Sequence, residues 1–150
     1  MPAITLADIT SADWSLALDT IGAPGSGLGG VVQGAADVNQ CIEIILTTPK
    51  GSDPLRPTFA CDLWQFIDNP INSAIPAIVR EVTSALTIWE PRITLIQVAA
   101  ALATHDSTQS GAHLNVTVNW RLKLSKVGRS ISPFASVHTT TVRIPVPGSA

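Results

Sequence analysis

The stretch Trp89-Glu90-Pro91-Arg92 marks the point where a helical pattern gives way to a strand pattern. Proline disfavours the α conformation in the residue before it, so Glu90 should end the helix. Pro91 has a fixed φ and no N–H, which suits a turn into the strand. If Glu90 and Arg92 are both extended, their side chains leave the same side of the backbone, about 6.5 Å apart. Two interpretations stay open: a turn with a surface ion pair worth about 0–1 kcal/mol, or a charged corner that docks against a partner.

Two helices are predicted before this corner. The first begins near Asp37, a plausible N-cap, and ends before Pro49. The second can be capped by Ser73, with Pro76 in the first turn, where a missing N–H costs little. Apolar residues at helical spacing give each helix a buried stripe. The first stripe contains Val38, Cys41, Ile42, Ile45 and Leu46, and the second contains Ile75, Ile78, Val79, Val82, Leu86 and Trp89.

Three strand patterns follow the corner. Residues 93–102 are apolar on both sides, which favours a central strand. Residues 114–124 alternate strictly between apolar and polar, which indicates a strand with one buried face. Residues 137–146 are rich in Thr and Val and form the last predicted strand. The predicted fold is therefore α+β, with an antiparallel C-terminal sheet packed against two main helices.

The N-terminal part is predicted to be a small extension. Trp14, Leu16 and Leu18 alternate with small or polar residues, and Val31-Val32-Gln33 can return as a second strand. A glycine-rich loop separates the two segments. Residues 1–34 are therefore expected to form an N-terminal hairpin, and residues 35–150 one domain.

The composition is unusual in its lack of charge. Charged residues make up 13% of the 150, against about 25% in a typical domain. Since the cores of protein interfaces are also depleted in charge, much of the surface is expected to be covered by partners. The alternative is a monomer with few charges.

Charge and hydropathy exclude several classes of partner. The net charge of −2 comes without a basic stripe, so nucleic-acid binding has no support. The first residues lack a basic region and a long apolar core, and the apolar run 93–103 is too short to span a bilayer. A soluble protein made in a cytosol is expected, with Cys41 and Cys61 as buried thiols.

Cofactor and metal motifs are weak or absent. Residues 25–30 fit GxGxxG by letter, but no helix opens directly after them, as a dinucleotide site requires. His105, His113 and His138 do not have metal-ligand spacing. There is also no GxSxG elbow. No cofactor and no metal are therefore predicted.

A muramidase remains as the enzyme alternative, because it needs only two carboxylates across a cleft. Glu90 is one candidate acid, but Arg92 beside it favours the ionised form, which is wrong for a general acid. Nothing in the sequence places a second carboxylate opposite Glu90. The conceivable partners are Glu43, Asp62, Asp68 and Glu81.

Three motifs in this order resemble the baseplate wedge family of contractile-tailed phages, sometimes labelled lysozyme-like, whose domain also occurs in contractile injection systems and type VI secretion baseplates. They are the Thr48-Pro49-Lys50-Gly51 turn, the Arg56-Pro57-Thr58-Phe59 loop and Glu90-Pro91-Arg92. The resemblance covers roughly residues 35–146. Cys61 departs from it, since the family usually has glycine there.

The resemblance implies a non-enzymatic structural role in the virion tail baseplate, assembled in the host cytoplasm. Such proteins join other baseplate wedge proteins and initiate the tail sheath by strand addition, and a central spike, hub or tube protein is a further conceivable partner. Glu90, Pro91 and Arg92 are then expected to contact wedge proteins. The segment 137–146 is expected to accept a strand of the tail sheath protein, with Val137, Thr139, Thr141 and Arg143 at that interface. An exposed sheet edge can template such pairing through its main chain.

Overall fold

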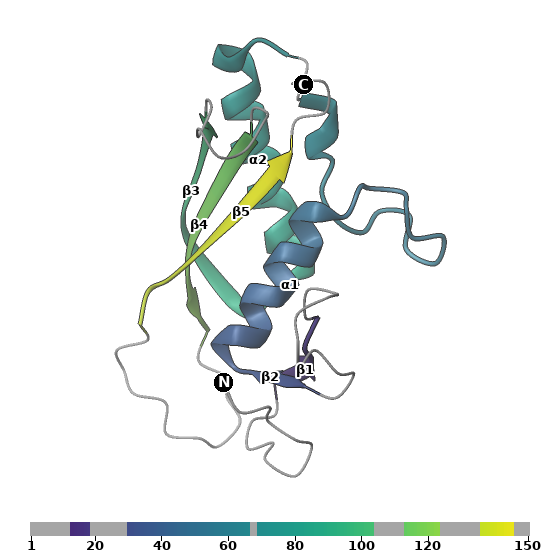
Figure 1. Cartoon of the computed structure of the whole chain (residues 1–150), viewed down its shortest axis with the longest axis vertical. Coiled ribbons are helices and arrows are strands. Elements are labelled where there is room, and N and C mark those ends of the chain that lie inside the picture. Colours follow the sequence, from purple (N-terminus) through teal and green to yellow (C-terminus); the bar gives the residue numbers. More distant parts are fainter. Residues whose placement is uncertain (1–12, 19–29, 67–68, 104–112, 124–135, 146–150) are drawn as a thin grey trace. The chain divides into compact units, whose positions relative to one another are not determined.

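The computed structural model describes residues 13–18, 30–66, 69–103, 113–123 and 136–145. The chain divides into two compact units, residues 1–42 and 43–150. Within the described residues, the elements are two short strands, an α-helix, a 3₁₀ turn, a second α-helix and three longer strands (Figure 1). Residues 25–29 of the glycine-rich motif (residues 25–30) and His105 lie outside the described residues.

The first unit contains the predicted hairpin. Strand β1 (Trp14–Leu16) pairs antiparallel with β2 (Val31–Gln33), with Trp14 opposite Gln33. The side chain of Gln40, in the helix that follows, ties this hairpin to that helix. Its Nε2 donates to the Leu16 carbonyl oxygen at 2.8 Å, and its Oε1 accepts from the Leu18 N–H at 2.8 Å.

Helix α1 (Ala35–Thr47) begins three residues earlier than an N-cap at Asp37 predicts. Gly34 has φ +59°, a left-handed conformation that glycine adopts at little cost, and its carbonyl accepts the Val38 N–H. Asp37 is therefore not the N-cap but a buried residue of the first turn. The apolar stripe is confirmed, since Val38, Ile42, Ile45 and Leu46 are all buried.

Helix α2 (Ile71–Trp89) also starts earlier than predicted. Pro70 occupies the N-cap position, and its carbonyl accepts from the Ser73 and Ala74 N–H groups. Ser73 is therefore inside the first turn, where its hydroxyl donates to the Pro70 carbonyl at 2.9 Å. Pro76 lies inside the helix, so the carbonyl of Asn72 loses its intrahelical donor. A short 3₁₀ turn, η2 (Leu63–Phe66), packs against α2.

The three longer strands form one antiparallel sheet in the order β3-β4-β5 (Figure 1). They are β3 (Ile93–Ala103), β4 (His113–Leu122) and β5 (His138–Pro145). The central strand is therefore β4, and the prediction that residues 93–102 form a central strand is wrong. The small side chains of β3 explain the error, because Ala99 and Ala101 look apolar in the sequence but lie exposed on the outer face.

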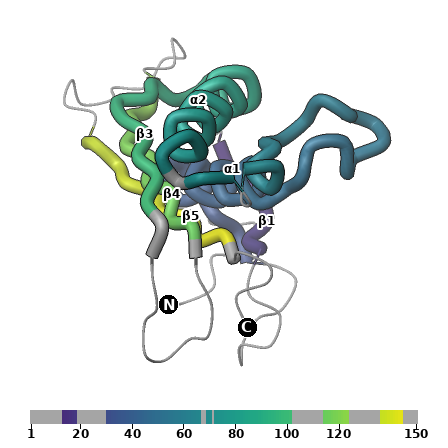
Figure 2. The backbone as a smooth tube through the Cα atoms, turned by 90° about the horizontal axis from the view of Figure 1, so that it is seen from above, coloured from purple at the N-terminus to yellow at the C-terminus, as the bar shows by residue number. Residues whose placement is uncertain are grey.

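The core of the second unit lies on one face of this sheet. Leu114, Val116, Val118 and Trp120 of β4 are buried, as the strict alternation predicts. Helix α2 packs across β3 (Figure 2) with Ile78, Val82 and Leu86 buried. Trp120 donates its indole N–H to the Thr140 hydroxyl at 2.9 Å, which satisfies both polar groups in the interior. The α+β fold class is confirmed.

Candidate functional site

The helix-to-strand corner at Glu90-Pro91-Arg92 is a tight turn. Glu90 ends α2 with φ −124° and ψ 68°, and its N–H donates to the Leu86 carbonyl at 2.9 Å. The Ile93 N–H donates back to the Glu90 carbonyl at 3.4 Å, which closes the turn. The carbonyl of Arg92 accepts the Lys123 N–H at 2.7 Å, so the corner is also fixed to the end of β4.

The two charged side chains of this corner form a bidentate pair. Arg92 Nε donates to Glu90 Oε1 at 2.6 Å, and the second guanidinium nitrogen donates to Oε2 at 2.9 Å. The Glu90 side chain is only 4% exposed and that of Arg92 is 31% exposed. The interpretation as a surface ion pair is therefore wrong for Glu90.

The burial of Glu90 makes Arg92 structurally necessary. A buried carboxylate without a partner loses its hydration without compensation, which is far more costly than losing an exposed ion pair. Pro91 itself is exposed at the apex of the turn. The corner therefore presents a proline ring and the outer side of a guanidinium, with the carboxylate already satisfied from within the chain.

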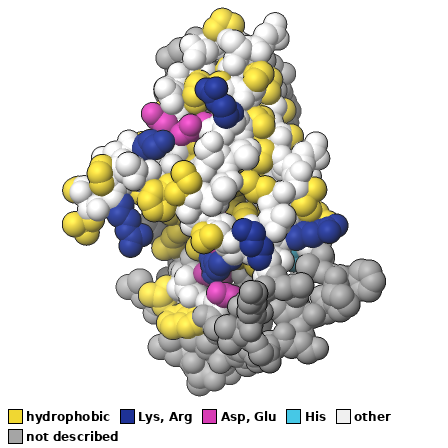
Figure 3. All heavy atoms as spheres, turned by 180° about the vertical axis from the view of Figure 1, so that it is seen from behind, with side chains coloured by type: hydrophobic (Ala, Val, Ile, Leu, Met, Phe, Trp, Pro, Cys, Tyr) yellow, Lys and Arg dark blue, Asp and Glu magenta, His cyan; other side chains and the backbone are white. Residues whose placement is uncertain are grey.

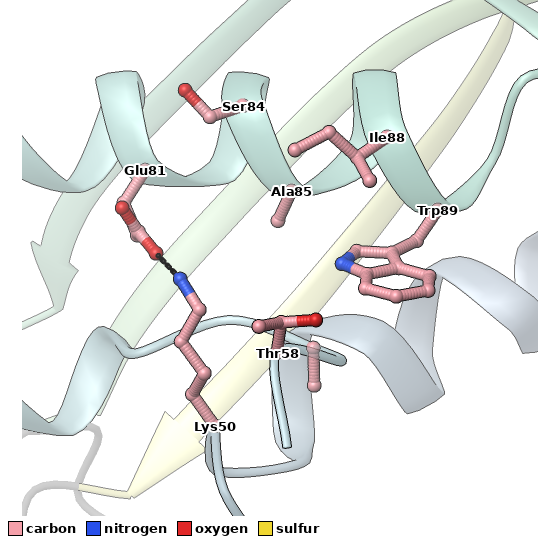
Figure 4. Close-up of a pocket in the computed structure, with 8 residues that line it drawn as sticks. Lys50, Thr58, Glu81, Ser84, Ala85, Ile88 and Trp89 are labelled. Atoms are coloured by element: carbon pink, nitrogen blue, oxygen red, sulfur yellow. Dashed lines mark hydrogen bonds and ion pairs between the residues drawn. The ribbon is translucent and has the colours of Figure 1, made fainter. Parts of the chain in front are cut away.

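A groove lies beside the last turns of α2 (Figure 4). Its cavity volume is about 220 Å³, and α2 faces the segment from Lys50 to Ala60 across it. At one end, Lys50 Nζ contacts Glu81 Oε1 at 3.2 Å. At the other end, Trp89 meets Phe59 edge to face, with ring centroids 5.1 Å apart. The sequence motifs include residues of both walls, Lys50 and Thr58 on one side and the helix of Trp89 on the other, but they do not predict the groove between them.

The loop that forms one wall of this groove is held by its own hydrogen bonds. The Leu55 N–H donates to Asp53 Oδ1 at 2.9 Å, and the Phe59 N–H donates to the Arg56 carbonyl at 2.8 Å. Gly51, with φ +85°, allows the first turn. Leu55 is 92% exposed on this ordered loop. A single exposed leucine is common on protein surfaces and does not by itself mark an interaction site.

Among the described residues, this groove contains one of the candidate carboxylates. Glu90 is not among the residues that line the groove, where Glu81 is the carboxylate and is paired with Lys50. Glu43 is exposed on α1, and Asp68 lies outside the described residues. No two of the described candidates face each other across the hollow, as a glycoside hydrolase would require.

Of the two thiols expected to be buried, Cys61 is buried and Cys41 is only half-buried. Burial raises the pKa of the Cys61 thiol to about 12, so it is not a nucleophile at neutral pH. His138 stacks on Trp120 with ring centroids 4.8 Å apart. Within the described ranges, no group of His, Cys, Asp and Glu could hold a metal ion. Among those same residues, no helix is long and apolar enough to cross a membrane.

The outer edge of β5 contains the other predicted interface residues. Val137 immediately precedes the strand, and Thr139, Thr141 and Arg143 lie on its exposed face. The side chains of Thr140, Val142 and Ile144 alternate with them and are buried.

The direction of the main-chain groups on β5 follows from one hydrogen bond. The Lys123 N–H donates toward β3, to Arg92, and in an antiparallel sheet alternate residues bond to opposite neighbours. Odd-numbered residues of β4 therefore bond to β3 and even-numbered residues bond to β5. Trp120 pairs with His138 and Val118 with Thr140, so the odd-numbered residues of β5 direct their N–H and C=O outward. Pro145 fits this parity, because a proline is tolerated where no N–H is needed.

Comparison with known proteins gives a family. The model of the family described as "Baseplate wedge protein gp25" matches residues 32–127. The chain belongs to this family. A structural role in a tail baseplate and contact with other baseplate components follow from that membership. No curated protein sequence matches the chain.

Three solved structures resemble this baseplate wedge protein. A Geobacter sulfurreducens protein, provisionally named a tail lysozyme, is 26% identical, with a TM-score of 0.59 over 79% of this chain and 98% of its own. The postcontracted pyocin R2 baseplate contains a chain that is 26% identical, with a TM-score of 0.50 over 73% of this chain and 99% of that chain. A chain of the type VI secretion baseplate complex is 15% identical, with a TM-score of 0.52 and coverage of 73% and 90%, and shows the shared fold alone.

The first prediction concerns the corner pair. Arg92→Ala should lower the free energy of unfolding of the isolated chain by about 1–3 kcal/mol, because it leaves the Glu90 carboxylate buried and unpaired. Lys50→Ala is the matched control, since it breaks the more exposed pair with Glu81 and should cost about 0–1 kcal/mol. Chemical denaturation of both variants measures the difference. Equal losses would mean that burial of Glu90 has no energetic consequence.

The second prediction concerns Cys61. Its pKa lies near 12 in the folded chain against 9.0 for an ordinary thiol, so above pH 9 the unfolded state releases a proton that the folded state keeps. The free energy of unfolding should therefore fall as pH rises from 9 toward 12. The slope should stay below the roughly 1.4 kcal/mol per pH unit of one full proton. In Cys61→Ala this part of the slope should disappear, and an unchanged slope would contradict the assignment.

Proposed function

We propose that this protein is a non-enzymatic component of the inner baseplate that joins wedge proteins and initiates the tail sheath. The observation that supports sheath initiation is the outer edge of β5. Thr139 and Thr141 direct main-chain donors and acceptors outward, and no strand among the described residues pairs with this edge. Such an edge can accept an extended arm of the tail sheath protein as a further strand, with main-chain hydrogen bonds that depend little on side-chain identity.

The corner is the proposed contact with neighbouring wedge proteins. Pro91 and the outer side of Arg92 form a rigid surface, because the bidentate bond to Glu90 fixes the guanidinium before any partner arrives. Preorganisation of this kind reduces the entropy lost on binding. The low share of charged residues supports the same interpretation, and on the face that Figure 3 draws, small groups of charged side chains lie among larger hydrophobic and uncharged areas.

The remaining parts of the proposal concern place and partners. Assembly is proposed to occur in the host cytoplasm, with the finished protein in the tail baseplate. A central spike, hub or tube protein is a further candidate partner. Residues 1–34 are proposed as an extension separate from the wedge domain of residues 35–150.

A single proline tests strand addition at β5. Thr141→Pro removes an outward N–H and leaves the ladder to β4 intact, so the variant should fold and enter baseplates, but tails should lack sheath. Deleting residues 137–150 is a poorer test, because it also removes buried Thr140, Val142 and Ile144. Electron microscopy of assembled particles provides the measurement.

Two control variants support this experiment. Thr141→Ala keeps the main-chain N–H and should give normal sheathed tails. Val142→Pro removes an N–H that bonds to β4 and should unfold the chain, which checks the assigned parity. Sheathed tails at normal frequency with Thr141→Pro built into the baseplate would refute strand addition at this edge.

A muramidase is the alternative function, favoured by the name of the Geobacter protein and by the presence of Glu90. A purified muramidase should clear a peptidoglycan suspension and lose that activity in Glu90→Gln. The expected result is no clearing by either form, because Glu90 is buried and bound to Arg92. Egg-white lysozyme is the positive control. Clearing by the unmodified chain that disappears in the glutamine variant would establish the enzyme instead.

A further inference from the structure

Strand β3 forms the second edge of the sheet, and its main-chain groups can be assigned in the same way. Odd-numbered residues of β4 bond to β3, so Asn119 with Gln97, Thr117 with Ala99, and Asn115 with Ala101 are the hydrogen-bonded pairs. The residues between them, Val98 and Ala100, therefore direct their N–H and C=O away from β4. Within the described part of the chain, no strand lies beyond β3 and no hydrogen bond reaches these outward groups.

Apart from one irregularity near its start, this edge lacks the usual protection against pairing. Natural edge strands are shielded by charged residues, prolines or bulges, yet the 11 residues of β3 include neither a charge nor a proline. One register shift occurs between Leu95 and Gln97, so the remaining stretch to Ala103 is regular. In contrast, β5 carries Arg143 and Pro145. The more open of the two edges is therefore β3.

The side chains along this edge indicate what can lie beside it. On the outer face, Gln97, Ala99 and Ala101 are exposed, and on the core side Val98 and Ala100 are only partly buried. Cross-strand pairs stabilise a sheet most when large or β-branched side chains meet, and pairs of alanines contribute least. A second copy of β3 would place alanine against alanine. A strand with larger side chains would instead cover the alanines and extend the apolar core.

We propose that the outer edge of β3 is a second strand-acceptor site. Its occupant is an uncharged extended segment of a different baseplate chain, with apolar side chains on the core side and β-branched or larger side chains on the other. This proposal rests on β3 alone and does not depend on the role proposed for β5. With both edges occupied, the domain would join two different chains through one continuous sheet.

Hydrogen exchange of single amides tests the proposal. In the isolated full-length chain, the Val98 and Ala100 amides should exchange rapidly, whereas those of Ala99 and Ala101 should be protected by the ladder to β4. In the assembled baseplate, Val98 and Ala100 should slow by about 100-fold or more, as expected for amides in a stable sheet. Outward amides that exchange equally fast in both states would overturn the proposal, and so would amides already protected in the dilute chain.

Substitution at one position supplies an independent test. Ala100→Pro removes an outward N–H and should fold normally but lose incorporation into baseplates, whereas Ala100→Ser keeps the N–H and should be incorporated normally. Sedimentation of the isolated chain distinguishes the occupant. Protection of Val98 and Ala100 that appears only with dimerisation would assign the edge to a second copy and overturn the heterologous strand. Normal incorporation of a folded Ala100→Pro chain would overturn the site itself.

Discussion

The bidentate bond between Arg92 and Glu90 is the constraint on which the second unit depends. It allows a carboxylate to be buried where α2 ends and β3 begins, and the carbonyl of Arg92 also receives the N–H of Lys123 beyond β4. A single turn thus fixes the end of a helix, the start of an edge strand and the end of the central strand. Because the pair is satisfied within the chain, the corner keeps its shape without a partner. This distinguishes it from a charged patch that becomes ordered only on binding.

Local patterns in the sequence predict most of the elements because they report side-chain burial. The alternation from Leu114 to Trp120 predicts a half-buried strand, and Pro91 predicts the helix end at Glu90, and both are confirmed. Helix starts are less predictable, since Gly34 and Pro70 begin the helices earlier than the nearest polar caps suggest. Strand order is not encoded locally. An alanine-rich strand looks buried in the sequence but occupies an edge.

The candidate sites are also predictable only in part from the sequence. The Glu90-Pro91-Arg92 motif is visible in the sequence, but the burial of its carboxylate is not, because burial depends on elements distant in the chain. The groove between α2 and the loop that contains Phe59 has no motif of its own, since its walls come from two segments. Which residues of β5 direct their N–H and C=O groups outward depends on the register of β5 against β4. That register is known only from the paired strands in the structure. The sequence motifs are therefore enough to identify the wedge family. The burial of Glu90, the groove and the direction of the β5 main-chain groups can be seen only in the folded structure.

No described strand pairs with the outer edges of β3 and β5, and this has a consequence for the free protein at high concentration in a cell. Each edge can recruit any compatible strand, including those of partly folded neighbours, so unassembled copies are prone to irregular aggregation. The risk grows with concentration and ends when the edges are occupied. Synthesis in step with the other tail components would therefore protect this chain better than a standing pool, and overproduction alone should favour inclusion bodies over soluble product.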